Sequence, residues 1–375
     1  MEITRLQLFS YRNYKTADIK FGSGLNVIVG ENAQGKTNLL EAVYFTVVGK
    51  SFRAKREKEV INMDSDIARI KVDIKKEIGT STVEIIFSKT HKKTVKINGI
   101  PIQKISELLG EFNGVFFAPD ELKLIKESPE DRRRFMDIDI SQTSKQYFYL
   151  LTRYDKILAN RNKLLKTEHN QTDLKNMLSI WNEQLADCAL KISKFRQNFV
   201  HTLAPYAQMA HSYLSSQKEN LSVEYVGIKE DTVQDIISVL ERNFEKDIAL
   251  GYTSYGIHRD DIKVCLNGID VRSYGSQGQQ RTCALSLKLA ELEIIKNQTR
   301  STPVLLLDDV LSELDETRKI KLLKFCSKAQ TLISCTSFPY KEIKCNKIVV
   351  KNGEVKYWHL IIIVLKFIQT RGKNG

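Results

Sequence analysis

The sequence lacks the cysteine pattern of a zinc-binding or disulfide-rich protein. Its six cysteines are scattered along 375 residues and form no C-x-x-C pair, and its six histidines do not cluster. Structural zinc sites and disulfide frameworks both need closely and regularly spaced ligands or pairs. We therefore expect reduced thiols, which are typical of a cytosolic protein.

The sequence also lacks a signal peptide and a membrane-length apolar run. The first fifteen residues carry charges at Glu2, Arg5 and Arg12 in place of the apolar centre of a signal peptide. The most apolar run, Leu360 to Leu365, is far shorter than the ~20 residues that cross a bilayer. We expect a last strand or an atypical tail there, and a cytoplasmic protein.

Positive charge is what the chain has in excess. Its 58 lysines and arginines against 45 acidic residues give a net charge of +13. This balance favours a polyanionic partner, which can be nucleic acid or an acidic membrane surface. The length, with 42% apolar and 27% charged residues, indicates a soluble globular protein of two or more compact units.

A phosphate-binding loop is the strongest motif. The residues G-E-N-A-Q-G-K-T follow the apolar run Leu25 to Val29 and precede an apolar helical pattern, and this context disfavours a chance match. The glycines let the backbone wrap round a phosphate, and the helix start adds amide donors. Lys36 would reach the β and γ phosphates, and the Thr37 hydroxyl would bind Mg²⁺. The residues expected to hold nucleotide are Gly30, Glu31, Asn32, Ala33, Gln34, Gly35, Lys36 and Thr37.

A second anion-directed motif opens a later helix. Ser276 to Gln279 reads S-Q-G-Q and begins the helical pattern that we expect to extend to Lys296. A hydroxyl and backbone donors at a helix start can face an anion. Taken alone the signal is modest, because serine at a helix start is usually only a cap.

A third motif delivers two carboxylates. The run Pro303 to Leu307 is apolar and ends in Asp308 and Asp309, which is typical of a buried strand with acids at its carboxyl end. Asp308 is placed to hold Mg²⁺ directly or through water, and Asp309 to orient or deprotonate an attacking water. A strand that merely ends in a polar turn is the alternative.

The rest of the chain separates into strands and then helices. Period-two alternation predicts strands over residues 3–21 and an antiparallel sheet over 68–102 with a turn at Asn98-Gly99. Apolar stripes beginning at Tyr147 and Met177 predict an antiparallel helix pair, each arm roughly 26 residues long, with the second ending at Pro205.

A basic run follows the first predicted helix. Its members are Lys50, Arg53, Lys55, Arg56 and Lys58, interrupted only by Glu57 as an acid. A solvated loop and a DNA-backbone contact surface explain this run equally well. Lys55 and Arg56 are the candidate DNA contacts.

The ordered motifs resemble those of ABC-type ATPases, in particular the branch with SMC-like heads. The set is the phosphate loop, Ser276 to Gln279, Val304 to Asp309 and then L-S-E-L-D over 311–315. Within that branch the chain closely resembles the RecF family of bacterial recombination mediators. The segments that carry this resemblance are Phe9 to Tyr14, Phe117 to Asp120, Arg132 to Asp137 and His258 to Asp261.

The resemblance implies an α/β fold with an ABC-type ATPase head, containing a central sheet and an antiparallel sheet, and an inserted, mostly helical lobe. Head segments would span 1–117 and 251–357, the lobe 118–250, and an atypical tail 358–375. It implies ATP and Mg²⁺ as cofactors, with Lys36, Asp308 and Asp309 as catalytic residues. Arg12 and Asn13 join the predicted nucleotide contacts. The phosphate loop and Asp308 of one subunit would face Ser276, Gly278 and Gln279 of another.

The implied function is ATP-dependent DNA binding in recombinational repair and replication-fork recovery. Such proteins form an ATP-dependent homodimer on duplex DNA near single-strand gaps and act with RecR and RecO to help RecA load. A weak, DNA-stimulated ATPase is expected. The alternative is a DNA clamp that uses ATP binding as a switch with negligible hydrolysis; a transporter ATPase and a P-loop metabolic kinase fit the motifs less well.

The chain departs from the wider ATPase pattern at three places. Asp309 stands where most ABC-type ATPases have glutamate. Pro119 and Asp120 occupy the region of the lobe-crossing glutamine, and Thr336 and Ser337 that of the switch histidine. These departures predict slow hydrolysis.

Overall fold

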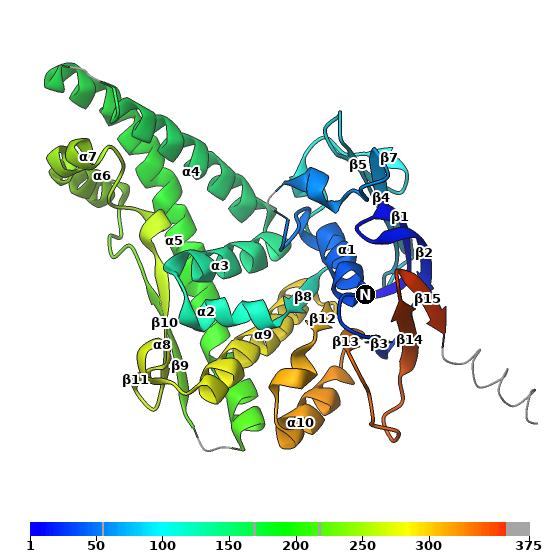
Figure 1. The fold of residues 1–375 in the computed structure, drawn as a ribbon. Helices are drawn as coiled ribbons and strands as arrows, with labels where there is room; N and C mark the ends of the chain where they lie inside the picture. The colour runs from blue at the N-terminus through cyan, green and yellow to red at the C-terminus, as the bar shows by residue number, and fades with distance from the viewer. Residues whose placement is uncertain (55, 168–169, 217–218, 358–375) are drawn as a thin grey trace, which may run out of the picture. The chain divides into compact units, whose positions relative to one another are not determined.

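The computed structural model describes residues 1–54, 56–167, 170–216 and 219–357 (Figure 1). Lys55 and the tail after residue 357 therefore lie outside the described residues. The chain forms two compact units. Unit 1 combines Met1–Glu121 with the residues from Glu291 onward, and unit 2 is Leu122–Ala290. The second unit is thus inserted between two segments that together build the first.

An antiparallel sheet forms one half of unit 1. Its strand order is β2-β1-β4-β5-β6-β7. The bounds are β1 Glu2–Tyr11, β2 Tyr14–Lys20, β4 Ile67–Lys75, β5 Thr80–Ser88, β6 Thr94–Ile97 and β7 Ile100–Pro101. Alternate residues of β4 and β5 are buried, as the period-two pattern predicts. The predicted turn between β6 and β7 is confirmed, since Asn98 and Gly99 both have positive φ.

A second sheet carries the phosphate loop and is mostly parallel. Its order is β15-β14-β3-β13-β12-β8, and only the β14–β15 pair is antiparallel. The bounds are β3 Leu25–Val29, β8 Gly114–Phe117, β12 Val304–Asp308, β13 Thr331–Cys335, β14 Asn346–Lys351 and β15 Glu354–Tyr357. Every residue of β12 and β13 is buried, which explains their unbroken apolar runs.

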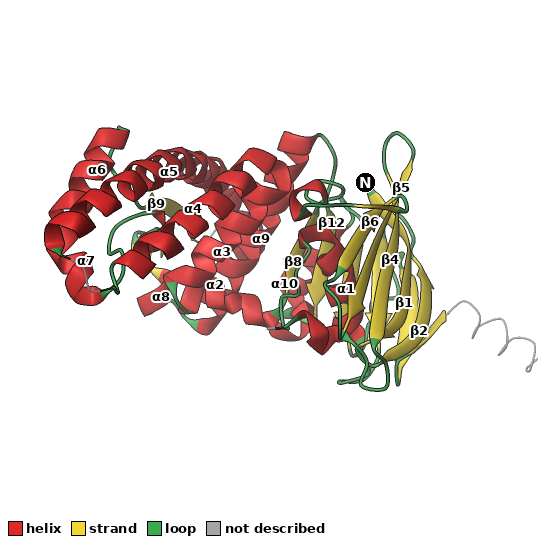
Figure 2. Cartoon of the chain, turned by 90° about the horizontal axis from the view of Figure 1, so that it is seen from above, coloured by secondary structure: helices red, strands yellow, loops and turns green. Residues whose placement is uncertain are grey.

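Helix α1, Lys36–Val48, lies between the two sheets (Figure 2). Its Phe45 ring packs on Phe87 of the antiparallel sheet at 4.9 Å, and its Tyr44 ring packs on Phe116 of β8 at 5.2 Å. Burial of each such side chain contributes roughly 1.5–3 kcal/mol. The helix is apolar on nearly all sides because both of its faces are covered.

Shorter elements complete unit 1. They are η1 Glu57–Val60, η2 Ile105–Glu107, η5 Val310–Glu313 and α10 Glu316–Cys326. Helix α9, Gln277–Thr299, begins in unit 2 and ends in unit 1. η3, Pro119–Leu122, covers the boundary at the other end of the insertion.

Unit 2 is mostly helical with a small sheet of order β11-β10-β9. Its helices are α2 Lys123–Lys126, α3 Pro129–Thr143, α4 Lys145–Leu164, α5 Gln171–Ser215, α6 Val233–Arg242, α7 Phe244–Leu250, η4 Ile257–Arg259 and α8 Val271–Tyr274. Its strands are β9 Leu221–Val226, β10 Asp261–Leu266 and β11 Ile269–Asp270. The predicted helix pair is present as α4 and α5, which lie side by side (Figure 1).

The lengths of the two paired helices differ from the prediction. Helix α4 has 20 residues and α5 has 45, and Pro205 lies inside α5 instead of ending it. Proline removes one helical hydrogen bond and bends a helix, but packing can outweigh that cost. Leu203, Ala207 and Leu214 are all buried on either side of Pro205, so the segment beyond it is held by unit 2.

The boundaries of the units also differ from the predicted division. Residues 251–290, expected in the second head segment, belong to unit 2. Strand β10 pairs along its whole length with β9, and Asp260 accepts a hydrogen bond from the buried Arg196 of α5 at 2.7 Å. These contacts fix the segment to the helical unit.

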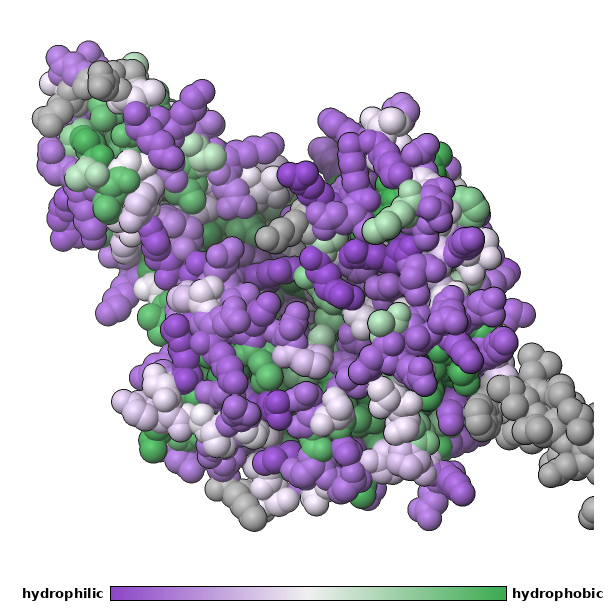
Figure 3. Space-filling view, viewed as in Figure 1, coloured by the Kyte–Doolittle hydropathy of each residue, from purple (hydrophilic) through white to green (hydrophobic). Residues whose placement is uncertain are grey.

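The outer surface is predominantly hydrophilic on the face shown in Figure 3. Among the described residues, no helix is both long enough and apolar enough to cross a membrane.

Candidate nucleotide site and basic surface

The phosphate loop joins β3 to α1 and needs glycine at two positions, Gly30 and Gly35. A Cβ atom on Gly30 would lie 2.3 Å from the Val350 carbonyl oxygen of β14. Gly35 has a φ of 112°, and a Cβ there would lie 2.6 Å from the Asn13 amide nitrogen. Only glycine accommodates such close approaches and this backbone conformation. The loop is therefore tightly held from both sides.

Lys36 is folded into the loop. Its Nζ donates to the carbonyl oxygens of Gly30 at 2.7 Å and Glu31 at 2.8 Å, and only 7% of the residue is exposed. A buried ammonium group needs such acceptors or a negative ligand. The charge is thus concentrated where the loop would receive a phosphate.

Thr37 and Asp308, which are 271 residues apart in sequence, meet in space. The Thr37 hydroxyl donates to Asp308 Oδ1 at 3.0 Å, and the Ser334 hydroxyl donates to the same oxygen at 2.6 Å. Asp308 is 6% exposed and lies at the end of β12 beside β13, so the sheet fixes its position. The two residues predicted to hold Mg²⁺ are brought together.

The donor chemistry of this pair fits Mg²⁺. A hydroxyl and a carboxylate are hard oxygen ligands, and Mg²⁺ in nucleotide sites takes one or two protein oxygens and completes its shell with phosphates and water. Among the described residues, no group of three or more His, Cys, Asp or Glu could hold a metal ion alone. Thr37 and Asp308 would therefore hold Mg²⁺ only together with a nucleotide.

Asp309 follows Asp308 directly and has an unusual backbone conformation. Its φ is 49°, a left-handed conformation that is uncommon for a residue other than glycine. Its backbone N–H donates to the Ser334 hydroxyl at 3.0 Å. Burial raises the pKa of the carboxyl group, and the neighbouring Asp308 raises it further while Lys36 opposes both. A raised pKa suits a group that accepts a proton from water.

A cavity of about 260 Å³ connects these residues. It is lined by Asn32, Ala33, Gly35, Lys36, Thr37, Asn38, Arg53, Asp308 and Asp309. Asn38 and Arg53 were not predicted as nucleotide contacts. The sequence signal for Arg53 was its place in the basic run, which pattern reasoning could not connect with the loop.

Arg12, Asn13 and Gln34 do not line this cavity. Arg12 forms a bidentate ion pair with the fully buried Glu41 at 2.9 and 2.7 Å. The Asn13 amide donates to the Gln34 carbonyl at 2.9 Å and accepts from Asn38 at 2.8 Å. In this structure Arg12 and Asn13 support the loop, and a direct contact with nucleotide stays a prediction.

The segment Ser276 to Gln279 forms a reciprocal cap within unit 2. The Ser276 hydroxyl accepts a hydrogen bond from the backbone N–H of Gln279 at 3.3 Å. In return, the side-chain oxygen of Gln279 accepts a hydrogen bond from the backbone N–H of Ser276 at 2.8 Å. Gln279 also donates to Glu219 Oε1 at 2.8 Å, and Glu219 Oε2 contacts His211 Nε2 at 2.9 Å. Ser276, Gln277 and Gly278 are exposed at the start of α9.

The structure also shows where the regions of the lobe-crossing glutamine and the switch histidine lie. Pro119 and Asp120 lie in the short helix η3, and Thr336 and Ser337 directly follow β13. None of these four residues lines the cavity that contains Lys36.

A second hollow in unit 1 is basic. It measures about 520 Å³ and lies between η1 and the connection from β5 to β6. It is lined by Arg56, Glu57, Lys58, Phe87, Ser88, Thr90, His91, Lys92 and Lys93. Lys93 pairs with Glu57 and donates to the Gly49 carbonyl, whereas Arg56, Lys58 and Lys92 have no ion pair within the described residues. Arg56 is thus part of a surface with surplus positive charge; Lys55 lies outside the described residues.

The sequence is similar to known proteins over most of its length. Residues 2–349 match the family model described as RecF/RecN/SMC N terminal domain. A protein of Alkaliphilus oremlandii named DNA replication and repair protein RecF is 44% identical over 345 residues, covering 90% of this chain and 93% of the relative. A protein of Clostridium kluyveri with the same name is 43% identical over 364 residues, covering 95% and 99%.

Solved structures agree with the sequence comparison. A structure of the recombination mediator protein RecF with ATP superposes with a TM-score of 0.87 at 34% identity, covering 95% of this chain and 97% of that one. An Smc head domain from Pyrococcus furiosus gives a TM-score of 0.55 at 16% identity over 98% of this chain and 99% of that one, which shows a shared fold. With the phosphate loop, the Thr37–Asp308 pair and the two-sheet head in place, the chain belongs to the RecF family.

Proposed function

We propose that this chain is an ATP-dependent DNA-binding protein of recombinational repair and replication-fork recovery. The observation that carries the proposal is the meeting of Thr37 with Asp308 at the mouth of the phosphate loop. Membership of the RecF family supports the repair role, because the relatives are named DNA replication and repair proteins and the similar solved structure is of a recombination mediator of the RecFOR pathway.

ATP is the proposed ligand of the cavity around Lys36. The loop amides and Lys36 would hold the phosphates, and Thr37 with Asp308 would hold Mg²⁺. Arg53 lines the cavity with an exposed guanidinium group and would add a charge-assisted contact to the bound anion. A bound Mg²⁺ ion would neutralise charge that develops on the phosphates during hydrolysis.

The nucleotide site is proposed to be completed by a second copy of the chain. All nine residues that line the cavity belong to unit 1, whereas the exposed cap Ser276 to Gln279 belongs to unit 2. The cap presents a hydroxyl and backbone donors to an anion. In the proposed homodimer, ATP is clamped between the loop of one subunit and the cap of the other, and hydrolysis releases the clamp.

Duplex DNA, including gapped or junction DNA, is the proposed partner of the basic hollow. Arg56, Lys58 and Lys92 provide positive charge that no ion pair within the described residues neutralises. Contacts to phosphates give salt-dependent affinity with little sequence preference. RecR and, functionally, RecO and RecA are the proposed protein partners in this pathway.

Analytical sedimentation of the full chain with and without ATP, and with and without a gapped duplex, tests the clamp. ATP should convert the chain to a dimer, and DNA should strengthen the dimer. Lys36→Met should lose ATP binding, whereas Ser276→Arg should bind ATP as a monomer and fail to dimerise. Normal ATP-driven dimerisation of Ser276→Arg would overturn the composite site while leaving ATP binding intact.

The basic hollow has a separate test. Arg56→Glu with Lys92→Glu should weaken duplex binding and lower the salt slope by up to about 0.9 for each lost phosphate contact. The pair Lys324→Glu and Lys328→Glu, at the end of α10, changes net charge equally and should retain most of the affinity. Equal weakening in both pairs would mean that net charge, and not this hollow, governs binding.

A DNA clamp that uses ATP only as a switch is the second candidate. Asp309 favours it, because a side chain one methylene shorter than glutamate reaches less far toward an attacking water. Single-turnover hydrolysis with saturating DNA separates the two candidates: measurable cleavage within the lifetime of the dimer supports an ATPase, and dimer dissociation without cleavage supports a switch.

A further inference from the structure

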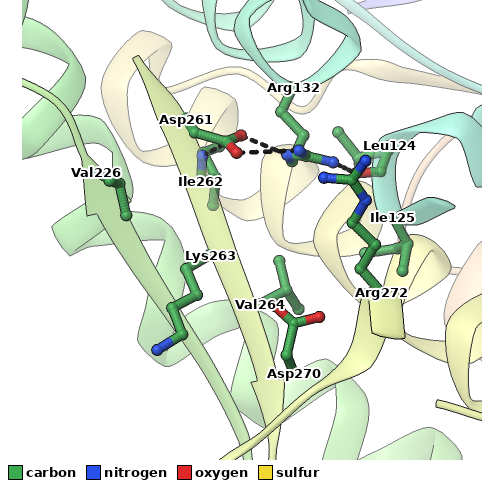
Figure 4. Close-up of a pocket in the computed structure, with 10 residues that line it drawn as sticks. All are labelled: Leu124, Ile125, Arg132, Val226, Asp261, Ile262, Lys263, Val264, Asp270 and Arg272. Carbon is green, nitrogen blue, oxygen red and sulfur yellow. Dashed lines mark hydrogen bonds and ion pairs between the residues drawn. The ribbon is translucent and has the colours of Figure 1, made fainter. Parts of the chain in front are cut away.

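A cavity of about 240 Å³ lies within unit 2, on the side of β10 that faces α2 and α3 (Figure 4). None of the nucleotide-site or basic-hollow residues lines it. Its walls come from α2, α3, the end of β9, β10 and the β11–α8 segment. The function proposed above does not use this cavity.

Part of the wall is apolar. Leu124 and Ile125 of α2 are 3% and 2% exposed, and Ile262 and Val264 of β10 are also buried. Val226, at the end of β9, is 50% exposed and forms part of the rim. Such a surface can receive an aliphatic or aromatic side chain.

The rest of the wall carries charged side chains, some of which already have partners within the protein. Arg132 is 4% exposed and forms a bidentate pair with Asp261, and it also donates to the Leu124 carbonyl at 3.3 Å. Asp270 accepts from the Ser273 N–H at 3.0 Å and caps α8. Both groups are therefore committed to the fold.

Arg272 and Lys263 are the two charged lining residues without such a commitment, and Figure 4 shows the Lys263 side chain directed away from Arg132 and Arg272. The Arg272 side chain is exposed, and it makes no hydrogen bond or ion pair within the part of the chain that the structure describes. Figure 4 shows its guanidinium group pointing toward the Arg132 side of the cavity. Arg132, Lys263 and Arg272 line the cavity against Asp261 and Asp270, so the wall has an excess of one positive charge. Asp261 is paired with Arg132, and Arg272 has no ion pair within the described residues.

We infer that this cavity binds a segment of a partner protein that carries a carboxylate beside an apolar side chain. Arg272 would form the charge-assisted contact with the carboxylate, and Leu124, Ile125 and Val264 would receive the apolar group. Arginine next to an apolar pocket is a typical centre of binding energy in protein interfaces.

A nucleic-acid backbone fits the cavity less well. A duplex presents its phosphates along a stiff, polar surface that cannot place an apolar group against Leu124 and Ile125. The chemistry of the wall therefore favours an acidic peptide segment.

A short segment of backbone connects the cavity residue Arg272 with the Ser276 cap. The Gln280 side chain donates to the Val271 carbonyl at 3.1 Å and to the Arg272 carbonyl at 3.4 Å, and the Gly275 N–H donates to Val271 at 3.0 Å. A partner held by Arg272 would thus contact the turn that leads into Ser276. This coupling rests on the proposed function, whereas the binding site itself does not.

Fluorescence anisotropy of a labelled peptide on the nucleotide-free full chain tests the site. The probe is Gly-Leu-Asp-Asp-Phe-Gly, and its control has asparagine in place of both aspartates. The acidic probe should bind saturably with a Kd below about 1 mM, and the amide probe at least roughly tenfold more weakly. ATP binding is not involved, so failure here is distinct from failure of the ATP clamp.

Variants locate the contact. Arg272→Ala should weaken binding of the acidic probe roughly tenfold. Arg272→Glu should bind the same peptide more tightly when lysine replaces aspartate. Arg242→Ala removes an equally exposed arginine from α6 and should leave binding unchanged. Equal binding by Arg272→Ala and the parent chain overturns the inference. So does binding of a single-stranded oligonucleotide that Arg272→Ala abolishes while the peptide does not bind.

Discussion

Asp309 combines strain, partial burial and a neighbouring like charge at one residue. Its left-handed backbone directs it away from the regular end of β12 and into the cavity that contains Lys36. Burial and Asp308 both raise the pKa of its carboxyl group. Since an acid with a raised pKa costs stability when it is ionised at neutral pH, this residue is better explained by chemistry than by folding.

Asp309→Asn should therefore separate hydrolysis from stability. We expect the turnover of ATP to fall by about 10²-fold or more, because the amide cannot accept a proton from water. ATP affinity should be unchanged, and the thermal midpoint should not decrease. Equilibrium nucleotide binding, single-turnover hydrolysis and thermal unfolding measure the three effects.

Asp309→Glu is the matched variant. Its longer side chain should preserve or increase turnover if the reach of Asp309 limits hydrolysis. Turnover of Asp309→Asn at the parent rate would exclude this carboxylate as the group that activates water.

Glu219 is a positioning residue for the Ser276 cap. It accepts from the Gln279 amide, whose carbonyl oxygen in turn accepts from the Ser276 N–H. Glu219→Ala should weaken ATP-driven dimerisation roughly tenfold, because one charge-assisted hydrogen bond is lost. ATP binding by the monomer should not change, which a general loss of structure would not allow.

Sedimentation at a series of chain concentrations measures this effect. Glu219→Gln keeps an oxygen acceptor and should restore dimerisation, while Glu224→Ala, an exposed acid on β9, should match the parent chain. A dimer of unchanged affinity in Glu219→Ala would remove any role of Glu219 in holding the cap.

Helix α4 is joined to η4 by a partly buried histidine. His258 Nε2 donates to the Thr253 carbonyl at 2.9 Å, so its Nδ1 accepts from the Tyr154 hydroxyl at 2.7 Å. This arrangement needs the neutral ring. Burial, with Arg259 and Arg133 nearby, lowers the pKa of His258 to about 4 from 6.5, although the Thr253 carbonyl opposes the shift.

The sign of the pH effect follows from this shift. Above pH 6.5 the ring is neutral in both folded and unfolded chains, and the full stability is present. Between pH 6.5 and 4 the unfolded chain binds the proton first, so stability is lost by on the order of 3 kcal/mol. Urea unfolding of the full chain across this range should show the loss.

His258→Gln should reduce that loss, because glutamine offers a donor and an acceptor without titrating. His201→Gln, which changes an exposed histidine of α5, should retain the pH dependence of the parent chain. Identical pH profiles for the parent chain and His258→Gln would assign the effect to other groups.

Sequence patterns predicted the elements whose periodicity is set by burial. The two sheets of unit 1 and the α4–α5 pair were predicted correctly. The pattern of apolar residues in β4, β5 and β12 matches the pattern of buried positions in these strands. The motifs also placed Thr37, Asp308 and Asp309 at one sheet edge, since parallel strands end together.

The elements that depend on tertiary contacts were not predicted. The continuation of α5 through Pro205 depends on packing within unit 2, and so does the assignment of residues 251–290 to that unit. Arg53 reaches the nucleotide cavity only because the chain turns back after α1, a path that local periodicity does not specify. Arg12 forms an ion pair with the buried Glu41, and its contact with nucleotide stays a prediction.

The activity of the whole molecule should depend on its concentration. If two copies complete each nucleotide site, the ATPase rate per chain should rise with chain concentration until dimers predominate. At the low end, total rate should follow about the second power of concentration, as mass action requires. A dilution series at saturating ATP measures this dependence.

If gapped duplex DNA holds two copies together, as proposed, it should shift the same curve to lower concentration. Lys36→Met, which should not bind ATP, gives the background rate of the assay. A rate per chain that stays constant on dilution below the measured dimer dissociation constant would contradict the composite site.

The order of strands in the phosphate-loop sheet has a consequence for synthesis on the ribosome. Strand β3 is flanked by β13 and β14, and β8 is flanked by β12, so each waits for partners from the far end of the chain. At about 5–20 residues per second, the interval is on the order of tens of seconds. The antiparallel sheet and the inserted unit can fold in that time, while the nascent β3 and β8 keep open edges. These edges make the half-made chain a natural client for chaperones.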